Sequence, residues 1–453
     1  MLSQSLFKPT NTKKLFIFVL ILMLGSLLLG CGSGAATPAS SPDATVPKAV
    51  DLSGQKITLL MITPHVVADK ALAEWFNAET GAVVQLAEVG YPDLLDQTLA
   101  DISASSPQYD VVEIWYPTLG TLVEAGALTD LTEFIKANET VIQPDDFIDN
   151  LYDPYTLYKG KRWAIPFDGD THVLFYRKSL LEKHNLTPPE TWDDYLHVAK
   201  TITEQEGSSG VYGSAIMGNA APILIVSSFL NRLGGYGGQL LDSNGQPAVN
   251  SPEAVAALAA MLEESAYALP TPLDTDFDVA RDAFLTGKVA MVEQWTDIGV
   301  MAEDVNQSTI QGDWGVVQMP MGSGGKAQHA PALNAGFSLG LSSKAKNVEA
   351  AQEFLRFAAR PDITIRVSTI TGGLDPTRIS VVNSKEYKEF APEVSAAAQA
   401  ALTGATAWPT SPEMPQLMDA LIANLVAALE GKKSPQQALD ETQARWEEIL
   451  GSK

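Results

Sequence analysis

Cysteine, histidine and positive charge are all scarce in this sequence. The 453 residues contain one cysteine, Cys31, and five histidines. No histidine or cysteine pair has the spacing of a zinc site, and one cysteine excludes an intramolecular disulfide, so packing must stabilise the fold. The 30 lysines and arginines face 54 aspartates and glutamates, a net charge of -24. This charge argues against nucleic acid and against polybasic membrane attachment as binding partners.

Motifs for phosphate binding and for covalent catalysis are also lacking. The glycine-rich residues 234–238 have neither the lysine nor the hydroxyl of a phosphate loop, and residues 322–325 do not form a nucleophile elbow. Both glycine-rich segments are interpreted as turns. No cofactor is expected. The length suggests two or three domains, and a hydrophobic content of 45% is enough for a large core.

The N-terminus carries the pattern of an exported protein. Lys8, Lys13 and Lys14 precede an apolar run at 15–24 that resumes at 27–29. This run predicts a signal peptide over residues 1–30, because it is too short and wrongly flanked for a stable membrane span.

A lipid anchor is predicted directly after the signal peptide. The residues Leu28-Leu29-Gly30-Cys31 resemble the bacterial lipobox, although Leu29 is bulkier than usual. We therefore expect Cys31 to carry diacylglycerol. Residues 31–50 are rich in small residues, proline and serine, which is typical of a flexible tether.

Strand and helix patterns alternate from residue 57 onward. Strands are predicted at 57–62, 83–89 and 109–116, with helices at 69–80 and 94–102 between them. This βαβαβ order favours a mostly parallel sheet covered by helices on both faces. Ligands bind such sheets beyond the carboxyl ends of the strands, where Trp115 and Tyr116 lie. Further helices are predicted at 191–203, from 252, and at 278–285, 347–359, 417–430 and 435–450, with a strand at 289–292.

Residues 163–178 concentrate the most chemistry in the chain. Asp168, Asp170 and His172 surround Gly169 among several aromatics and lead into an alternating apolar segment. Aromatic faces and carboxylates suit a polyhydroxylated ligand, but a loop entering a buried strand fits the same pattern. Asp168 and Asp170 could also form a glycosidase pair, although carboxylates two residues apart usually act together rather than across a bond.

Several motifs, in order along the chain, resemble family 1 extracellular solute-binding proteins, the carbohydrate-binding lipoproteins of bacterial ABC importers and relatives of maltose-binding protein. The most specific is the FLTGKVAM segment at 284–291, followed by Trp295. The others are DVVEIW at 110–115 with GALTDL at 126–131, YKGKRWAIP at 158–166, NAGFSLGL at 334–341 and GGLDPTR at 372–378.

The resemblance implies a two-lobe α/β fold of the type II periplasmic-binding-protein class, with the ligand in the cleft between the lobes. The expected first lobe is 51–171 plus 338–391, and the second is 172–337 plus 392–453. By position in the family, the ligand-binding side chains would be His65, Trp115, Tyr116, Asp168, Asp170, His172, Trp295, Asp297, Asn334, Arg378 and Trp408.

The resulting functional prediction is a non-enzymatic, lipid-anchored, monomeric protein on the outer face of the cytoplasmic membrane. It would capture a mono-, di- or small oligosaccharide or a polyol by hinge closure and deliver it to a permease with its ATPase. Three alternatives remain: a binder of a polyamine or thiamine, a glycoside hydrolase using Asp168 and Asp170, and a structural surface lipoprotein.

Overall fold

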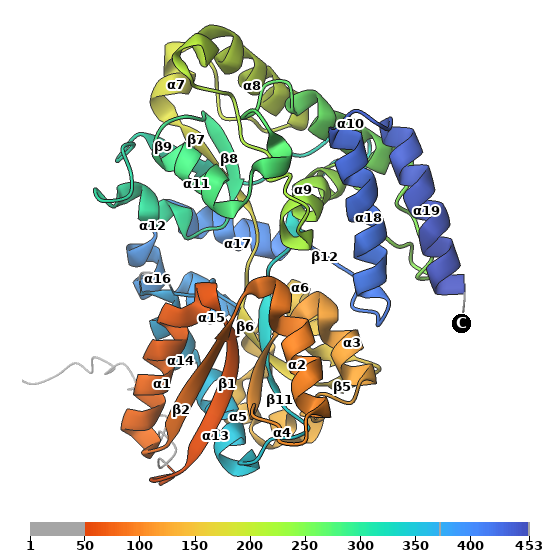
Figure 1. Cartoon of the computed structure of the whole chain (residues 1–453). Coiled ribbons are helices and arrows are strands. Elements are labelled where there is room, and N and C mark those ends of the chain that lie inside the picture. Colours follow the sequence, from red (N-terminus) through yellow and green to blue (C-terminus); the bar gives the residue numbers. More distant parts are fainter. Residues whose placement is uncertain (1–49, 371–372, 452–453) are drawn as a thin grey trace, which may run out of the picture. The chain divides into compact units, whose positions relative to one another are not determined.

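The computed structural model describes residues 50–370 and 373–451. A five-stranded sheet and a three-stranded sheet organise this part of the chain (Figure 1). The first sheet has the order β2 (Val83–Val89), β1 (Lys56–Ile62), β3 (Val111–Trp115), β11 (Phe337–Leu341) and β6 (Ala164–Asp168). The second sheet has the order β8 (Met291–Gln294), β7 (Val173–Arg177) and β9 (Trp314–Val317), all antiparallel.

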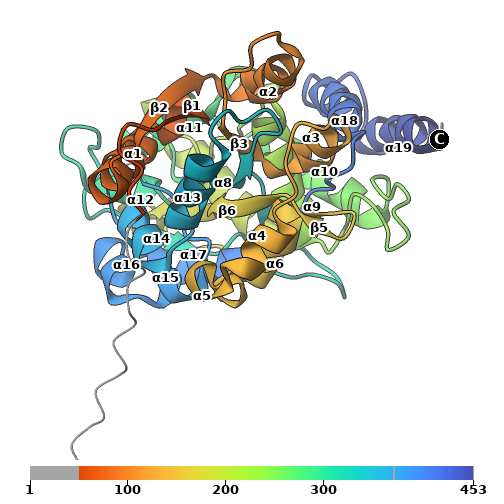
Figure 2. The ribbon, with the colours of Figure 1, turned by 90° about the horizontal axis from the view of Figure 1, so that it is seen from below.

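Strand β1 is buried on both faces, which explains its continuous apolar sequence. Leu59 and Met61 belong to the hydrophobic cluster that also holds residues of α1 (Val66–Thr80) and α13 (Val348–Ala358). Leu60 and Ile62 belong to the cluster formed with α2 (Leu94–Ser103) and α3 (Leu119–Glu124). Helices α1 and α13 contact each other and are neighbours in the view of Figure 2.

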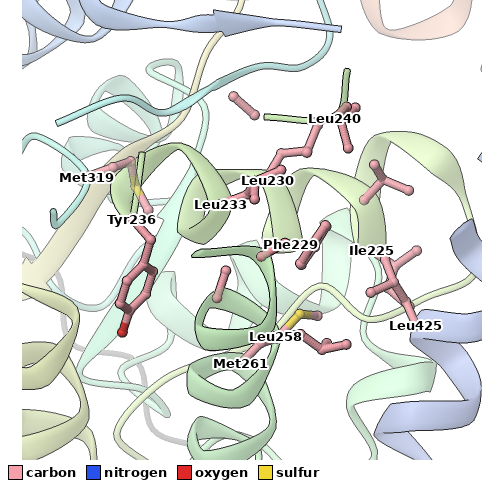
Figure 3. Close-up of a cluster of buried hydrophobic side chains, with 14 of the residues drawn as sticks. Ile225, Phe229, Leu230, Leu233, Tyr236, Leu240, Leu258, Met261, Met319 and Leu425 are labelled. Carbon is pink, nitrogen blue, oxygen red and sulfur yellow. The ribbon is translucent and has the colours of Figure 1, made fainter. Parts of the chain in front are cut away.

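A separate hydrophobic core forms among the helices near the second sheet. Helix α9 (Ser227–Gly235) packs against α10 (Pro252–Glu264), and the segment before α9 packs against α18 (Met414–Leu429). Figure 3 shows Phe229 and Leu233 of α9 facing this core together with Leu258 and Met261 of α10. Helices α8 (Trp192–Glu206) and α19 (Pro435–Gly451) contribute further buried side chains.

The remaining elements connect and cover these layers. The helices are α4 (Thr132–Ala137), α5 (Glu139–Ile142), α6 (Asp149–Thr156), α7 (Lys178–Lys183), α11 (Phe277–Leu285), α12 (Ile298–Glu303), α14 (Pro361–Ser368), α15 (Ile379–Asn383), α16 (Lys385–Phe390) and α17 (Val394–Gly404). The short strands are β4 (Leu157–Tyr158), β5 (Lys161–Arg162), β10 (Ala332–Leu333) and β12 (Thr406–Ala407), and a 3-10 turn η1 (Thr63–His65) follows β1.

The predicted strands and helices are confirmed to within a few residues, as are two predicted caps. Ser251 accepts a hydrogen bond from Ala254 N–H at the start of α10. Ser434 and Gln437 form the reciprocal capping box of α19. The prediction of a mostly parallel sheet was wrong for half of the first sheet. β1 runs parallel to β2 and β3, but β11 returns from the second sheet and pairs antiparallel with β3 and β6.

The predicted signal peptide, Cys31 and nearly all of the tether lie outside the described residues. Across 50–370 and 373–451, no helix has both the length and the apolarity needed to cross a bilayer.

Candidate functional site

The segment between Asp168 and Val173 leads from the last strand of the first sheet into the second sheet. Gly169 N–H donates to the Asp375 carbonyl in the loop before α15. A Cβ on Gly169 would lie 2.1 Å from the carbonyl oxygen of Pro376, so this close approach requires glycine. The backbone therefore holds Asp168, Asp170 and His172 against a loop from the far end of the sequence.

Four aspartates gather at this crossing. The Asp168 carboxylate accepts a hydrogen bond from Asp375 N–H at 2.7 Å, and the Asp375 carboxylate accepts one from the Thr296 hydroxyl. Burial, followed by the charge of Asp168, raises the pKa of Asp170 well above its ordinary value. The same two causes raise the pKa of Asp375 to about 8 and that of Asp297 to about 6. Asp375 was not among the predicted ligand residues, because only the fold brings it here.

His172 is fully buried, and its neighbours define its tautomer. The Asn231 amide oxygen accepts a hydrogen bond from Ala332 N–H, and its nitrogen donates to Glu293 and faces His172 Nδ1 at 2.8 Å. Because the Asn231 amide nitrogen donates this hydrogen bond, His172 Nδ1 must accept it. The imidazole proton therefore lies on Nε2. Burial and the positive charge of Arg232 lower the pKa of His172 to about 3, which keeps the ring neutral.

Two aromatic pairs lie among the predicted ligand residues. The Trp295 ring meets His172 edge-on, with 4.4 Å between the ring centroids. The Trp115 and Trp408 rings meet edge-on with their centroids 5.2 Å apart. Trp115 also donates its Nε1–H to the Asn334 carbonyl at 2.9 Å, which orients the indole.

Six of the predicted residues have a buried polar atom with no protein partner. These atoms are Trp295 Nε1, Trp408 Nε1, Asn334 Nδ2, His172 Nε2, Asp297 Oδ1 and Arg378 Nε. An unpaired buried polar atom costs about 1–3 kcal/mol, so a ligand that formed hydrogen bonds with these atoms would remove that cost.

The predicted ligand residues Tyr116 and Arg378 form hydrogen bonds within the protein. The Tyr116 hydroxyl donates to the Leu333 carbonyl, accepts from Trp408 N–H, and its ring stacks on Tyr155. The Arg378 guanidinium is fully buried over Phe147. It donates to the carbonyls of Ile142, Gln143 and Ala359 and contacts the Asp146 carboxylate. These contacts tie both side chains to the surrounding protein, although Arg378 Nε has no partner.

His65 lies in a buried group of acidic residues at the end of β1. Its Nδ1 is 2.9 Å from Glu113 Oε1, and its Nε2 is 3.3 Å from Asp168 Oδ2. Burial disfavours the imidazolium, but the charges and hydrogen bonds of Glu113 and Asp168 outweigh this and raise the pKa of His65 well above its ordinary value. Asp69, which the sequence did not single out, completes the group. One potential ligand atom from each of His65, Asp69 and Glu113 lies within 4.8 Å of the others.

A small recess of about 50 Å³ opens beside Asp297 and Asp375. Thr296, Asp297 and Asp375 line its polar side, and Tyr387, Phe390 and Ala391 line its other side. Polar groups from the segment after β8 and the loop before α15 therefore face aromatic groups of α16 across this recess.

The structure has two sheets of an α/β fold that are linked by several passes of the chain, and a polar and aromatic site lies at the crossings. This arrangement defines a type II periplasmic-binding-protein fold. The chain matches the family model of the bacterial extracellular solute-binding proteins over residues 64–365 and belongs to that family. This family consists of binding proteins and not enzymes, so the glycosidase alternative is rejected.

The relatives are distant but cover most of the chain. A probable amino-acid ABC transporter periplasmic-binding protein of Sinorhizobium fredii is 25% identical over 91% of this chain and 94% of its own. The maltotriose-binding protein of Pyrococcus abyssi is 26% identical over 61% of this chain and 56% of its own. A solute-binding protein of Agrobacterium radiobacter, solved with ribitol, has a TM-score of 0.77 and 26% identity, covering 88% of this chain and all of its own.

Proposed function

We propose that this protein binds a small sugar or a polyol between its two sheets and delivers it to an ABC permease. The observation that carries the proposal is the set of unpaired buried polar atoms on Trp295, Trp408, Asn334, His172 and Asp297. Three of these atoms are N–H donors by residue type, and Asn231 makes His172 Nε2 a fourth. A ligand dense in hydroxyl groups supplies acceptors for these donors and donors for the neighbouring carboxylates.

The proposed ligand set follows from these contacts. The aromatic faces are Trp115, Trp295 and Trp408, and the polar groups are Asp168, Asp170, His172, Asp297 and Asn334, to which we add Asp375. Tyr116, Arg378 and His65 are left out because their polar groups contact protein partners. The ribitol bound by the Agrobacterium protein and the maltotriose named for the Pyrococcus protein support this ligand class.

Binding would proceed by closure of two lobes about the crossings. The proposed lobes are residues 51–171 plus 338–391 and residues 172–337 plus 392–453, which place the first sheet in one lobe, apart from Phe337, and the second sheet in the other. A ligand held by Trp115 on one side and Trp295 on the other stabilises the closed state, because it contacts both lobes only there.

The proposed setting is the outer face of the cytoplasmic membrane. Lipid on Cys31 would anchor the chain, and the tether to residue 50 would leave the binding domain free to meet its permease as a monomer. The partners would be the permease subunits and their cytoplasmic ATPase.

A cationic solute such as a polyamine or thiamine is the second candidate, because four aspartates meet at the crossing. A protonated amine, however, has no lone pair to accept from Trp295, Trp408, Asn334 and His172. The unpaired donors therefore favour a sugar or polyol.

A thermal-shift panel of mono- and disaccharides, polyols, polyamines and thiamine tests the assignment. At least one neutral polyhydroxylated compound is expected to raise Tm, since a ligand that binds only the folded state stabilises it. A shift with polyamines or thiamine alone would overturn the sugar assignment, and no shift with any compound in a wider solute panel would overturn a solute-binding role.

A further inference from the structure

The group formed by His65, Asp69 and Glu113 is distinct from the aromatic solute site. His65 ends the turn after β1, Asp69 lies in the first turn of α1, and Glu113 lies on β3. Three neighbouring elements of the first sheet therefore contribute one side chain each. All three residues are at most 6% exposed.

Asp69 is the unusual member of the group. It is completely buried, and neither carboxylate oxygen has a hydrogen-bond donor. Its neighbour is the Glu113 carboxylate, which also accepts rather than donates when ionised. Two buried carboxylates side by side need a positive charge or a proton between them, because no N–H group of the described protein donates to Asp69.

The distances match the edge of a coordination polyhedron. Ligand atoms about 2.1 Å from one metal ion lie roughly 3.0–3.4 Å apart in octahedral or tetrahedral geometry. His65 Nδ1 and Glu113 Oε1 are 2.9 Å apart, and one oxygen of Asp69 lies within 4.8 Å of both.

The groups around these three side chains orient them for coordination. Asp168 Oδ2 lies 3.3 Å from His65 Nε2, the arrangement in which a carboxylate holds the Nε2–H and leaves the Nδ1 lone pair for a metal. Ile62 N–H donates to Glu113 Oε2 at 2.9 Å, which leaves Oε1 facing the group. An ordinary buried ion pair explains the contacts of His65 with Glu113 and Asp168, but it gives Asp69 no partner.

We propose that His65 Nδ1, Asp69 and Glu113 Oε1 bind one divalent transition-metal ion, Zn²⁺ or Mn²⁺, which ties β1, α1 and β3 together. One imidazole with two carboxylates suits these borderline ions better than Ca²⁺, which takes six to eight oxygen ligands. The ion neutralises the two ligating carboxylates and supplies the partner that Asp69 lacks. Its role is structural, at the edge of the first sheet where the solute site begins.

The test is metal content and metal binding of the purified full-length protein. Protein prepared without chelator is expected to hold about one Zn²⁺ or Mn²⁺ per chain by mass spectrometry. After chelation, Zn²⁺ or Mn²⁺ should raise Tm saturably and Ca²⁺ should not. Asp69→Asn should weaken metal binding at least about 10-fold, and Asp168→Asn about 10- to 100-fold, the usual effect of a group that orients a ligating histidine.

The control is an exposed pair with similar chemistry. Asp193 and His197 lie four residues apart on α8, both exposed, so His197→Gln removes a His–carboxylate pair at the surface that could bind zinc adventitiously. This variant is expected to keep the metal stoichiometry of the parent protein.

The stability of the Asp69→Asn variant also distinguishes a metal-binding role of Asp69 from a role in folding. Asparagine has nearly the size of aspartate and cannot ionise in this buried position, so the chelated variant should be at least as stable as the chelated parent. Metal-free protein whose Tm responds to neither Zn²⁺ nor Mn²⁺ would overturn the proposal, and so would an Asp69→Asn variant that binds metal as tightly as the parent.

Discussion

The Trp295 indole lies edge-on against the His172 imidazole, with the ring centroids 4.4 Å apart and an interplanar angle of 77°. Each ring presents a buried nitrogen, Nε1 of Trp295 and Nε2 of His172, that has no protein partner. Two neighbouring donors without acceptors form the most specific feature of the proposed solute site, and the first two predictions depend on them.

Trp295→Phe should weaken solute binding while leaving the ligand-free protein intact. The change keeps an aromatic ring beside His172 and removes only the indole N–H, which is bonded to nothing in the protein. A lost hydrogen bond of about 0.5–1.5 kcal/mol corresponds to roughly a 2- to 12-fold increase in Kd. Calorimetry with a solute found in the panel measures the change in Kd, and thermal unfolding of the ligand-free protein checks its fold.

The matched control is Trp75→Phe on α1, where the indole stacks on Arg366 away from the site. It is expected to leave Kd unchanged. A fall in ligand-free Tm for Trp295→Phe that is larger than for Trp75→Phe would mean that Trp295 is a packing residue.

His172 should remain a neutral Nε2–H tautomer across the pH range in which the protein works. Burial and Arg232 lower its pKa to about 3, and Asn231 donates to Nδ1. Nitrogen NMR of the imidazole should therefore show no titration between pH 5 and 8. A midpoint near 6.5 would contradict this prediction, since it is the value of an exposed histidine.

Ligand-free stability should fall as pH rises from 5 to 8. The pKa of Asp375 is raised to about 8, by burial and then by Asp168, so the folded state binds a proton that the unfolded state, with a pKa near 3.8, has already released. Because the folded state holds more protons in this window, the free energy of unfolding decreases with pH. The Asp297 carboxyl, with a pKa of about 6, adds to the slope only below that value.

Asp375→Asn is the variant that isolates this effect. Asparagine can still meet the Thr296 hydroxyl but does not ionise, so the decline in Tm between pH 6 and 8 should become shallower than in the parent protein. If the slope of Tm against pH were unchanged in this variant, a group other than Asp375 would be responsible for the pH dependence.

The strands and helices could be predicted from the sequence because the pattern of buried and exposed residues within each segment determines its secondary structure. Leu59 to Ile62 alternate between two helix-covered faces, and Ser251 and Ser434 begin helices whose caps lie within three residues. Asp375 could not be predicted from local pattern, since its partner Asp168 is 207 residues away. Asn231 was missed for the same reason: inside α9 it resembles any helical polar residue, and only the fold brings it to His172.

Position in the family predicted Trp295, Trp408 and Asn334, each of which has an unpaired buried nitrogen, but it could not separate residues with free polar atoms from residues bonded within the protein. Tyr116 is at the strand end where a ligand residue is expected, yet its hydroxyl joins Leu333 to Trp408. The hydrogen-bond partners of each polar atom, which the sequence does not contain, make this distinction.

Cys31→Ala should abolish lipid attachment and release the protein from the membrane fraction. Without the thiol there is no sulfur to carry diacylglycerol, and no other cysteine exists in the 453 residues. Mass spectrometry of the mature N-terminus and fractionation of cells measure the two effects. A parent protein whose mature N-terminus is not a lipidated Cys31 would contradict the predicted anchor.

Arg378→Met should lower stability sharply and leave solute affinity unchanged. The methionine keeps much of the packing over Phe147, but the carbonyls of Ile142 and Ala359 lose their donor. Removing a buried cation from such a network costs about 3–5 kcal/mol, measurable as the free energy of unfolding in urea.

The control for Arg378→Met is Arg445→Met, which removes an exposed arginine paired with Glu448 on α19. A surface pair contributes only about 0–1 kcal/mol, so this variant should unfold almost like the parent protein. If Arg378→Met instead kept its stability and lost solute binding, the structural role of Arg378 would be wrong and the role implied by its position in the family would be right. The hydrogen bonds from its guanidinium to the protein carbonyls favour the first result.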